Sequence, residues 1–305
     1  TLWQAGCADA EEIRGKVLDE EEFIKNRKDI VLGFTDQVPY WAKLTPERQV
    51  YSKLEVKRAS DKYIDISCGN QTSQQLGQLR GKHETGDEKF RITIELMQVV
   101  HNFFDVGKDP IGSCGLALVI FPGVHARLSN IDAEGKFKED EQFECAGKTT
   151  TRLKGQSARG MMKSFVKIRE LHPELFERLD LMQQPAAFID GILHAWRLED
   201  ISHTLPHTVF QRDQLATHLS NEARQKMAVC GQLQSIIAGS MTPVLQLTDT
   251  DFAFPFKSYA RKAKEQMHRD VRDSAKVETN PENYNVSSYG ILKMIGQALK
   301  EQEET

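Results

Sequence analysis

The run from Gly115 to Gly123 constrains the fold more than any other stretch of the chain. Between its two glycines it consists of Leu-Ala-Leu-Val-Ile-Phe-Pro, without a single charged or hydrogen-bonding side chain. A short, continuous apolar run between turn-forming glycines is typical of a buried strand. Such a strand lies inside a sheet whose faces are covered, which favours a protein with both helices and strands.

Other segments supply the rest of that sheet and its covering helices. Apolar residues alternate at positions 92, 94 and 96, as in a strand, and recur at four-residue steps from Leu215 to Met227, as in a helix. We predict strands near 30–36, 91–99, 116–121, 207–212 and 235–238. We predict helices near 157–170, 215–232 and 254–276. The expected fold class is therefore α/β, with one sheet between helices.

Length and composition narrow the class of protein. The 305 residues are enough for one large α/β domain with insertions or for two modest domains. No 18-residue apolar stretch occurs, so no membrane partner is predicted. The net charge of −4 argues against a uniformly basic nucleic-acid binder, so any DNA contact must come from local patches. The five scattered cysteines favour an intracellular, reducing compartment over a disulfide framework. Because no Met precedes Thr1, we expect a segment of a longer protein.

Three aspartates stand where a predicted strand ends or a predicted helix begins. Asp36 stands at the exit of the first strand, ahead of Pro39, which we expect to terminate it. Asp213 follows the strand near 207–212, and Asp249 precedes the helix near 254–276; they are 36 positions apart (249 − 213). Because hard cations prefer oxygen ligands, two such carboxylates in one fold could share a divalent metal ion.

These aspartates lie in motifs that resemble the DDE endonuclease core of pogo/Tigger transposases, which are related to mariner. In that family the first acid lies in Asn-x-Asp-Gln/Glu-Thr-Pro, the second opens Asp-Asn-Ala-Pro-x-His, and the third closes Pro-Pro-Asn-Thr-Thr-x-x-Leu-Gln-Pro-x-Asp. The matching residues are Asp36, Gln37, Pro39, Asp213, His218, Thr242, Leu245, Gln246 and Asp249. The run 118–123 also resembles the Leu-Val-Ile-Phe-Lys-Gly strand of that core.

The chain also departs from the family pattern. Departures fall at Val38, Pro122, Gln214, Leu215, Ala216 and Leu247, and the Pro-Pro-Asn of the third motif is missing. Asp36 and Asp213 are 177 positions apart (213 − 36), longer than the family spacing, which implies an inserted subdomain.

The resemblance implies an RNase H-like fold, a mixed sheet flanked by helices with inserted segments. It places Asp36 on the central strand, Asp213 on a neighbouring strand and Asp249 on a flanking helix, where they would hold two Mg²⁺ or Mn²⁺ ions. The implied activity is metal-dependent hydrolysis and strand transfer on double-stranded DNA, at transposon ends and target sites. The implied setting is the nucleus, with a homodimer as one option.

The same comparison suggests a division of the chain. We expect an acidic helical segment over 1–28 and a catalytic domain over 29–262. Insertions are expected near 60–90 and 130–206, and a helical tail over 263–305.

Alternatives stay open at the acids themselves. Asp190 is a rival second acid, although it lies 59 positions before Asp249 (249 − 190). Asp251 is a rival third acid, and Asp249 and Asp251 could also be helix N-caps. The histidines at 194, 203 and 207 suggest zinc, but no cysteine lies nearby to complete such a site.

Alternatives also stay open for the molecule as a whole. The stretch from Lys148 to Arg169 has seven basic residues and no acidic one. It could be the solvated face of a helix or an edge that contacts DNA phosphates. The chain could also be a catalytically inert, transposase-derived protein that binds nucleic acid or another protein, or a purely structural α/β protein.

Overall fold

The computed structural model describes residues 30–41, 91–103, 105, 107–145, 147–205, 207–213, 215–237, 252–274 and 287–303. The predicted third acid, Asp249, and its rival Asp251 lie outside these residues. So do the predicted N-terminal segment 1–28 and the predicted insertion near 60–90.

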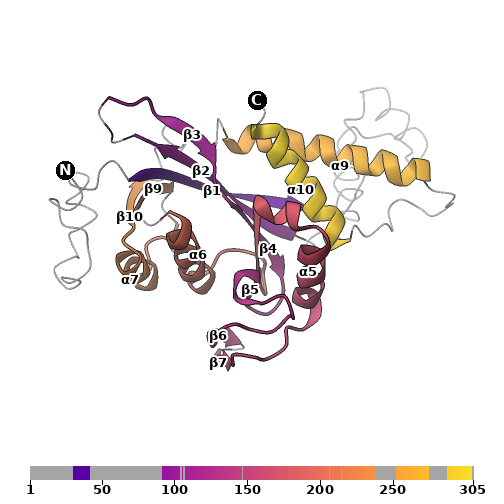
Figure 1. Cartoon of the computed structure of the whole chain (residues 1–305), viewed down its shortest axis with the longest axis horizontal. Coiled ribbons are helices and arrows are strands. Elements are labelled where there is room, and N and C mark those ends of the chain that lie inside the picture. The colour runs from indigo at the N-terminus through magenta and orange to yellow at the C-terminus, as the bar shows by residue number, and fades with distance from the viewer. Residues whose placement is uncertain are drawn as a thin grey trace, which may run out of the picture.

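An eight-stranded sheet forms the middle of the fold (Figure 1). Its strands are β1 (Val31–Trp41), β2 (Arg91–His101), β3 (Ile111–Cys114), β4 (Ala117–Pro122), β5 (Ala126–Arg127), β8 (Leu179–Gln184), β9 (Thr208–Asp213) and β10 (Leu233–Ile237). They lie in the order β10-β9-β1-β2-β4-β8-β5, and β3 pairs with the end of β2. A separate hairpin consists of β6 (Glu141–Cys145) and β7 (Lys148–Arg152).

The strands of the large sheet run in both directions. On one side of β1, β9 and then β10 run parallel to it. On the other side β2 is antiparallel to both β1 and β4, and β8 is parallel to β4. The interior strand β1 thus has one parallel and one antiparallel neighbour. This mixed sheet between helices is consistent with an RNase H-like α/β fold, as the sequence predicts.

Helices cover both faces of the sheet (Figure 1). One face carries α6 (Gly191–Thr204) and α7 (Asn221–Val229), and the other carries α5 (Gly160–Leu171), α9 (Phe254–Ser274) and α10 (Ser288–Glu303). Two 3-10 helices, η2 (Leu128–Asn130) and η3 (Pro173–Glu177), lie in the connections. Side chains alternate along a strand, so Leu96 joins the apolar cluster under α9 while its neighbour Met97 joins the cluster under α6.

The predicted strands are all present, as β1, β2, β4, β9 and β10. The predicted helices correspond to α5, α9 and the shorter α7. Sequence reasoning missed β8 and α6, both of which belong to or cover the large sheet within the range 130–206. The reason is buried polar side chains: Asp180 interrupts the apolar pattern of β8, and His194 and Arg197 interrupt that of α6. Towards the C-terminus, α9 runs through position 262 without a break.

The prediction that β1 ends near Asp36 is wrong, because the strand continues through Pro39 to Trp41. Beyond Phe34 no pairing with β9 remains, so β1 pairs there with β2 alone and the missing N–H of Pro39 is tolerated as on an edge strand. Before that point Gly33 lets β9 approach closely. A Cβ there would lie 2.9 Å from the Cγ2 of Thr208.

Candidate active site

Asp36 and Asp213 lie on neighbouring strands, β1 and β9. The parallel ladder between the strands ends with the pair Phe34 and Gln211. Each aspartate stands two residues beyond its member of that pair, so the two occupy equivalent positions past the last paired rung. Residues two apart on a strand point to the same face, so Asp36 shares the face of Phe34 and Asp213 that of Gln211. The two carboxylates therefore extend from adjacent strands to one side of the sheet.

The side that carries them is the one covered by α9. Val38, on the same face of β1 as Asp36, belongs to the same apolar cluster as Phe252, which precedes α9, and Phe256 in its first turn. Asp249 stands three positions before Phe252 in the sequence (252 − 249). The first two predicted acids and the helix that follows the third thus share one face of the sheet.

His218 contacts Asp213 from the turn that follows β9. Its Nδ1 lies 3.1 Å from the backbone oxygen of Asp213 and 3.3 Å from the carboxylate Oδ1. Both oxygens are acceptors, so Nδ1 carries the proton and donates it. The turn is fixed on both sides, because Ser220 accepts from the N–H of Ala223 to cap α7 and Gln234 of β10 donates to the carbonyl of His218 at 2.9 Å. A buried histidine thereby orients a half-exposed carboxylate.

A buried arginine stands behind this pair on the other face of the sheet. Arg212 donates from Nη1 to Nε2 of His194 at 3.0 Å. Because arginine only donates, His194 accepts through Nε2 and is neutral, with its proton on Nδ1. Burial, and then the charge of Arg212, hold the pKa of His194 well below its ordinary value. The ring centroids of His194 and His218 are 5.0 Å apart, so a chain of contacts runs from Arg212 to Asp213.

No described carboxylate forms an ion pair with Arg212. Its Nε and Nη2 are buried without a hydrogen-bond partner in the described structure, and its guanidinium carbon lies 3.8 Å from the centroid of the Phe210 ring. Burial lowers the pKa of Arg212 to about 10, although the charge of Glu95 opposes that shift. Buried donors without partners are costly, and perturbed groups of this kind concentrate at functional sites.

Asp190, the rival second acid, has a structural position instead. It is the N-cap of α6, where its Oδ1 accepts from the N–H of Leu193 at 2.9 Å. Its Oδ2 lies 2.6 Å from Nε2 of His125 and 3.2 Å from Nε2 of Gln184. Burial alone would raise the pKa of Asp190, but these hydrogen bonds outweigh it and the pKa lies below its ordinary value. Asp190 is on neither β1 nor β9, so it is not a strand neighbour of Asp36.

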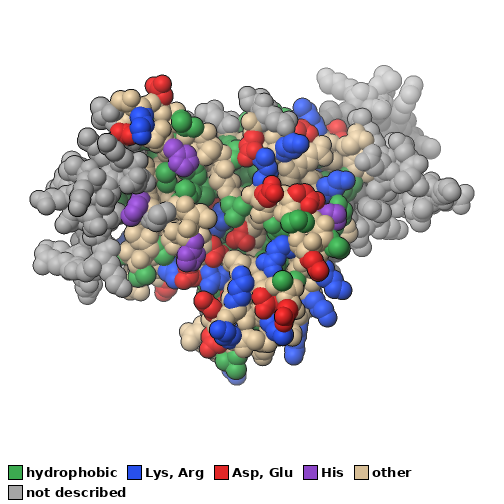
Figure 2. Space-filling model, viewed as in Figure 1, with side chains coloured by type: hydrophobic (Ala, Val, Ile, Leu, Met, Phe, Trp, Pro, Cys, Tyr) green, Lys and Arg blue, Asp and Glu red, His purple; other side chains and the backbone are tan. Residues whose placement is uncertain are grey.

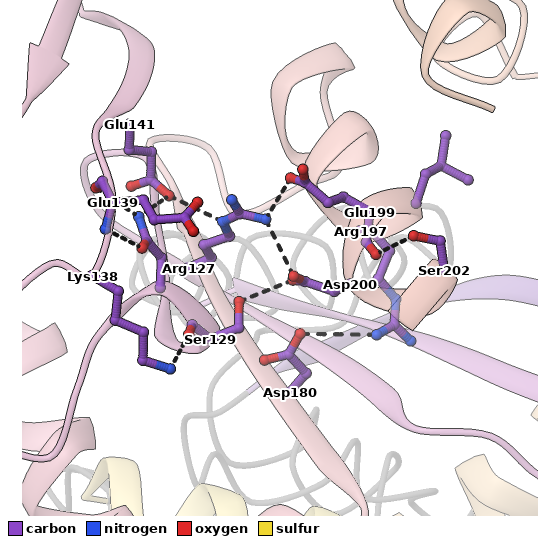
Figure 3. A network of polar contacts seen from close by, with 12 residues as sticks. Arg127, Ser129, Lys138, Glu139, Glu141, Asp180, Arg197, Glu199, Asp200 and Ser202 are labelled. Carbon is purple, nitrogen blue, oxygen red and sulfur yellow. Dashed lines mark hydrogen bonds and ion pairs between the residues drawn. The ribbon is translucent and has the colours of Figure 1, made fainter. Parts of the chain in front are cut away.

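A second set of buried charges joins the β6–β7 hairpin to α6 (Figure 3). Arg127 of β5 donates to Glu141 of β6 at 3.2 Å, to Glu199 at 2.9 Å and to Asp200 at 3.2 Å. Ser129 donates to the other oxygen of Asp200 at 3.0 Å. Burial would lower the pKa of Arg127, but the three carboxylates outweigh it and raise the pKa. Lys226 also pairs with Glu199, and Arg152 with Glu141, so three cations face three carboxylates, as expected of a structural link.

Arg197 of α6 extends this network towards the sheet. Its Nε donates to Glu95 of β2 at 3.1 Å, its Nη2 donates to the carbonyl of Leu116, and its Nη1 lies 3.9 Å from Asp180 of β8. Burial and then repulsion from Asp200 raise the pKa of Asp180 to about 6, against the attraction of Arg197.

Within the described ranges, which omit Asp249, no group of three or more His, Cys, Asp or Glu side chains could hold a metal ion. The histidines considered for zinc lie in different settings: Nε2 of His194 faces Arg212, and His203 is exposed. Sequence reasoning missed Arg212 and His194. The sequence did contain one indication of Arg212. It lies on the same strand face as Phe210, where an apolar residue is expected.

No family model matches the chain, and neither a curated protein nor a solved structure matches it. In the part of the chain that the structure describes, no helix is both long enough and apolar enough to cross a membrane.

Proposed function

We propose that the chain is the metal-dependent endonuclease core of a DDE-type DNA transposase, which cuts and joins phosphodiester bonds. One observation carries the proposal. Asp36 and Asp213 occupy equivalent positions on adjacent parallel strands and extend to the side covered by α9. They are 177 positions apart in sequence (213 − 36), so it is the pairing of β1 with β9 that brings their strands together. The motif resemblance of Asp36, His218 and Asp249 to the pogo/Tigger core supports the same assignment.

The donor set fits a hard divalent cation. Asp36 and Asp213 offer carboxylate oxygens, which Mg²⁺ and Mn²⁺ prefer, and Arg212 points to the opposite face of β9. His218 donates to Asp213, in keeping with the outer hydrogen bonds that orient metal-binding carboxylates. We propose Asp249 as the third ligand. Bound there, two cations would supply a nucleophile derived from water and stabilise the leaving oxygen of the scissile phosphate.

The test is nicking of supercoiled plasmid in Mg²⁺ or Mn²⁺. Asp36→Asn and Asp213→Asn should each abolish nicking, because an amide keeps the shape of the side chain but loses the charge that binds the cation. Metal should also raise the unfolding temperature of the wild type, since a hundredfold excess over Kd stabilises by about 2.7 kcal/mol. Both variants should lose most of that gain. Asp190→Asn is the matched control: Asn is a competent N-cap, so nicking should persist.

A second pair of variants fixes the third ligand. Asp249→Asn should abolish nicking and Asp251→Asn should preserve it, and the reverse result would move the ligand by two residues. A wild-type protein with neither nicking nor a metal-dependent shift at millimolar concentrations would overturn the nuclease proposal. The inert, transposase-derived DNA-binding protein would then be favoured, in line with the motif departures at Gln214 and Leu247.

A further inference from the structure

The structure divides the seven basic residues between Lys148 and Arg169 into two groups. Arg152 and Arg169 are partly buried, and the other five are exposed. None of the five makes an ion pair with a described residue. We call these five residues the basic face: Lys148, Lys154, Arg159, Lys163 and Lys167.

The two partly buried arginines hold the inserted segment together. Arg169 of α5 donates to the carbonyls of Leu128, Ile131 and Asp132 at 2.8 to 3.1 Å. Arg152 of β7 donates to Glu141 at 3.3 Å and lies 4.0 Å from the centroid of the Phe143 ring. These contacts account for both arginines. They account for none of the five exposed cations.

Three of the exposed cations form a stripe along α5. Arg159 is the N-cap of α5, and Lys163 and Lys167 follow at four-residue steps on the exposed part of the helix, away from the buried Met162 and Phe165. Like charges at this spacing repel one another, and cations near a helix N-terminus are unfavourable. The first turn of α5 has no acidic residue to offset them. The stripe therefore destabilises the helix that carries it. A helix face with no role beyond contact with water has no need of such an unfavourable arrangement.

The spacing of the stripe suits a nucleic-acid backbone. At 1.5 Å per residue, Lys163 and Lys167 are about 6 Å apart along the helix. Phosphates rise about 3.4 Å along each DNA strand, so this step is close to two phosphates. Figure 2 shows Lys and Arg side chains along the margin of the molecule where Figure 1 places α5.

The stripe stands on a fixed platform on the relevant side of the sheet. Met162, Phe165 and Val166 of α5 belong to the same apolar cluster as Val38 of β1 and Phe256 of α9. That is the face to which Asp36 and Asp213 extend. A duplex held along α5 would therefore lie on the same side of the sheet as the two carboxylates.

We propose that the basic face is a binding surface for the phosphate backbone of double-stranded DNA, independent of base sequence, with the α5 stripe as its main part. Asp140 accepts from the backbone N–H of Lys154 at 2.8 Å, so the hairpin end of the face has an acid beside it. This inference rests on the proposed function for its choice of DNA as the partner.

The experiment measures binding without cleavage. A fluorescent 30-base-pair duplex of arbitrary sequence is titrated with the full chain in EDTA, over a series of salt concentrations. The double variant Lys163→Glu with Lys167→Glu should bind roughly tenfold or more weakly at low salt. Its plot of log affinity against log salt should be shallower by about two units, since each phosphate contact contributes about 0.9. The single variants Lys167→Glu and Lys293→Glu are compared in the same way, and Lys293→Glu is the control, because it reverses one charge at an exposed lysine outside the basic face.

The outcomes separate this inference from the proposed function. A reduced slope in the α5 variant and an unchanged slope in the control support the basic face as the DNA surface. Equal losses in both variants, or a wild type that does not bind the duplex, overturn it. Because EDTA removes divalent metal, neither result depends on nicking, and a chain that nicks plasmid yet keeps its slope in the α5 variant would contradict this inference alone. Thermal unfolding of each variant confirms that the exposed substitutions leave the fold intact.

Discussion

Two arginines are buried on the α6 side of the sheet, and their surroundings differ. Arg197 donates to Glu95 at 3.1 Å and lies 3.9 Å from Asp180, with a backbone carbonyl as a further acceptor. Arg212 donates to the neutral ring of His194, and two of its nitrogens lack a partner in the described structure. Both side chains are almost completely buried. The difference therefore lies in the partners and not in the exposure.

The comparison separates a buried arginine that stabilises the fold through an ion pair from one that has no ion pair to lose. A buried ion pair is strongly destabilised when one partner is removed, because the other charge remains buried alone. An incompletely satisfied arginine leaves no such charge behind when it is removed. We therefore expect Arg197 to matter mainly for stability, and Arg212 to matter mainly for the contacts that lead through His194 and His218 to Asp213.

The largest effect should follow from Arg197→Met. It leaves the buried carboxylate of Glu95 without its partner, so the free energy of unfolding should fall by about 3–5 kcal/mol in urea denaturation. Adding Glu95→Gln should restore at least half of the loss, because the unpaired charge is then gone. If the free energy of unfolding of Arg197→Met alone falls by less than about 1 kcal/mol, the two arginines do not differ in their contribution to stability.

An intermediate effect should appear in the pH dependence of Asp180→Asn. The pKa of Asp180 is about 6 in the folded state against 3.8 ordinarily, so between these values the folded state binds the proton more tightly than the unfolded state. The free energy of unfolding contributed by this group therefore falls as pH rises from about 4 to 6. Asn cannot titrate. The free energy of unfolding of the variant, relative to that of the wild type, should therefore rise across that window by on the order of 2 kcal/mol.

Denaturation of both proteins at a series of pH values measures the gap. The matched control is Asp109→Asn, which makes the same substitution at an exposed aspartate. A gap for Asp180→Asn that narrows between pH 4 and 6 would contradict the direction of the shift.

The smallest change in stability should follow from Arg212→Met. Removing a buried charge that has no carboxylate partner is close to neutral, so the free energy of unfolding should change by less than about 1 kcal/mol. Nicking should nevertheless fall by about 10- to 100-fold, as it does when outer contacts of metal ligands are lost. If the variant unfolds easily, Arg212 holds the fold as Arg197 does. If it nicks normally, the contacts through the histidines do not orient Asp213.

The sequence predicted the structure best where the buried side chains are apolar. The Gly115–Gly123 run is apolar throughout and gave β4, and the alternation around Ile94 gave β2. Asp36 and Asp213 each follow an apolar run, and the motif resemblance implies that their strands are neighbours. α6 was missed because its buried side includes His194 and Arg197, which hydrophobic periodicity counts as exposed. Their partners, Arg212 and Glu95, come from strands distant in sequence, so no local pattern could identify them.

The pairing of β1 with β9 also has a consequence for how the chain is made. Val31 pairs with Thr208, which is synthesised 177 positions later (208 − 31). At about 5–20 residues per second, translation leaves that edge of β1 without its parallel partner for roughly 9–35 s. An uncovered strand edge is a template for association with other chains, and long-range parallel pairing is slow to form. Newly made protein should thus depend on chaperone protection of that edge for its yield, even where the finished fold is stable.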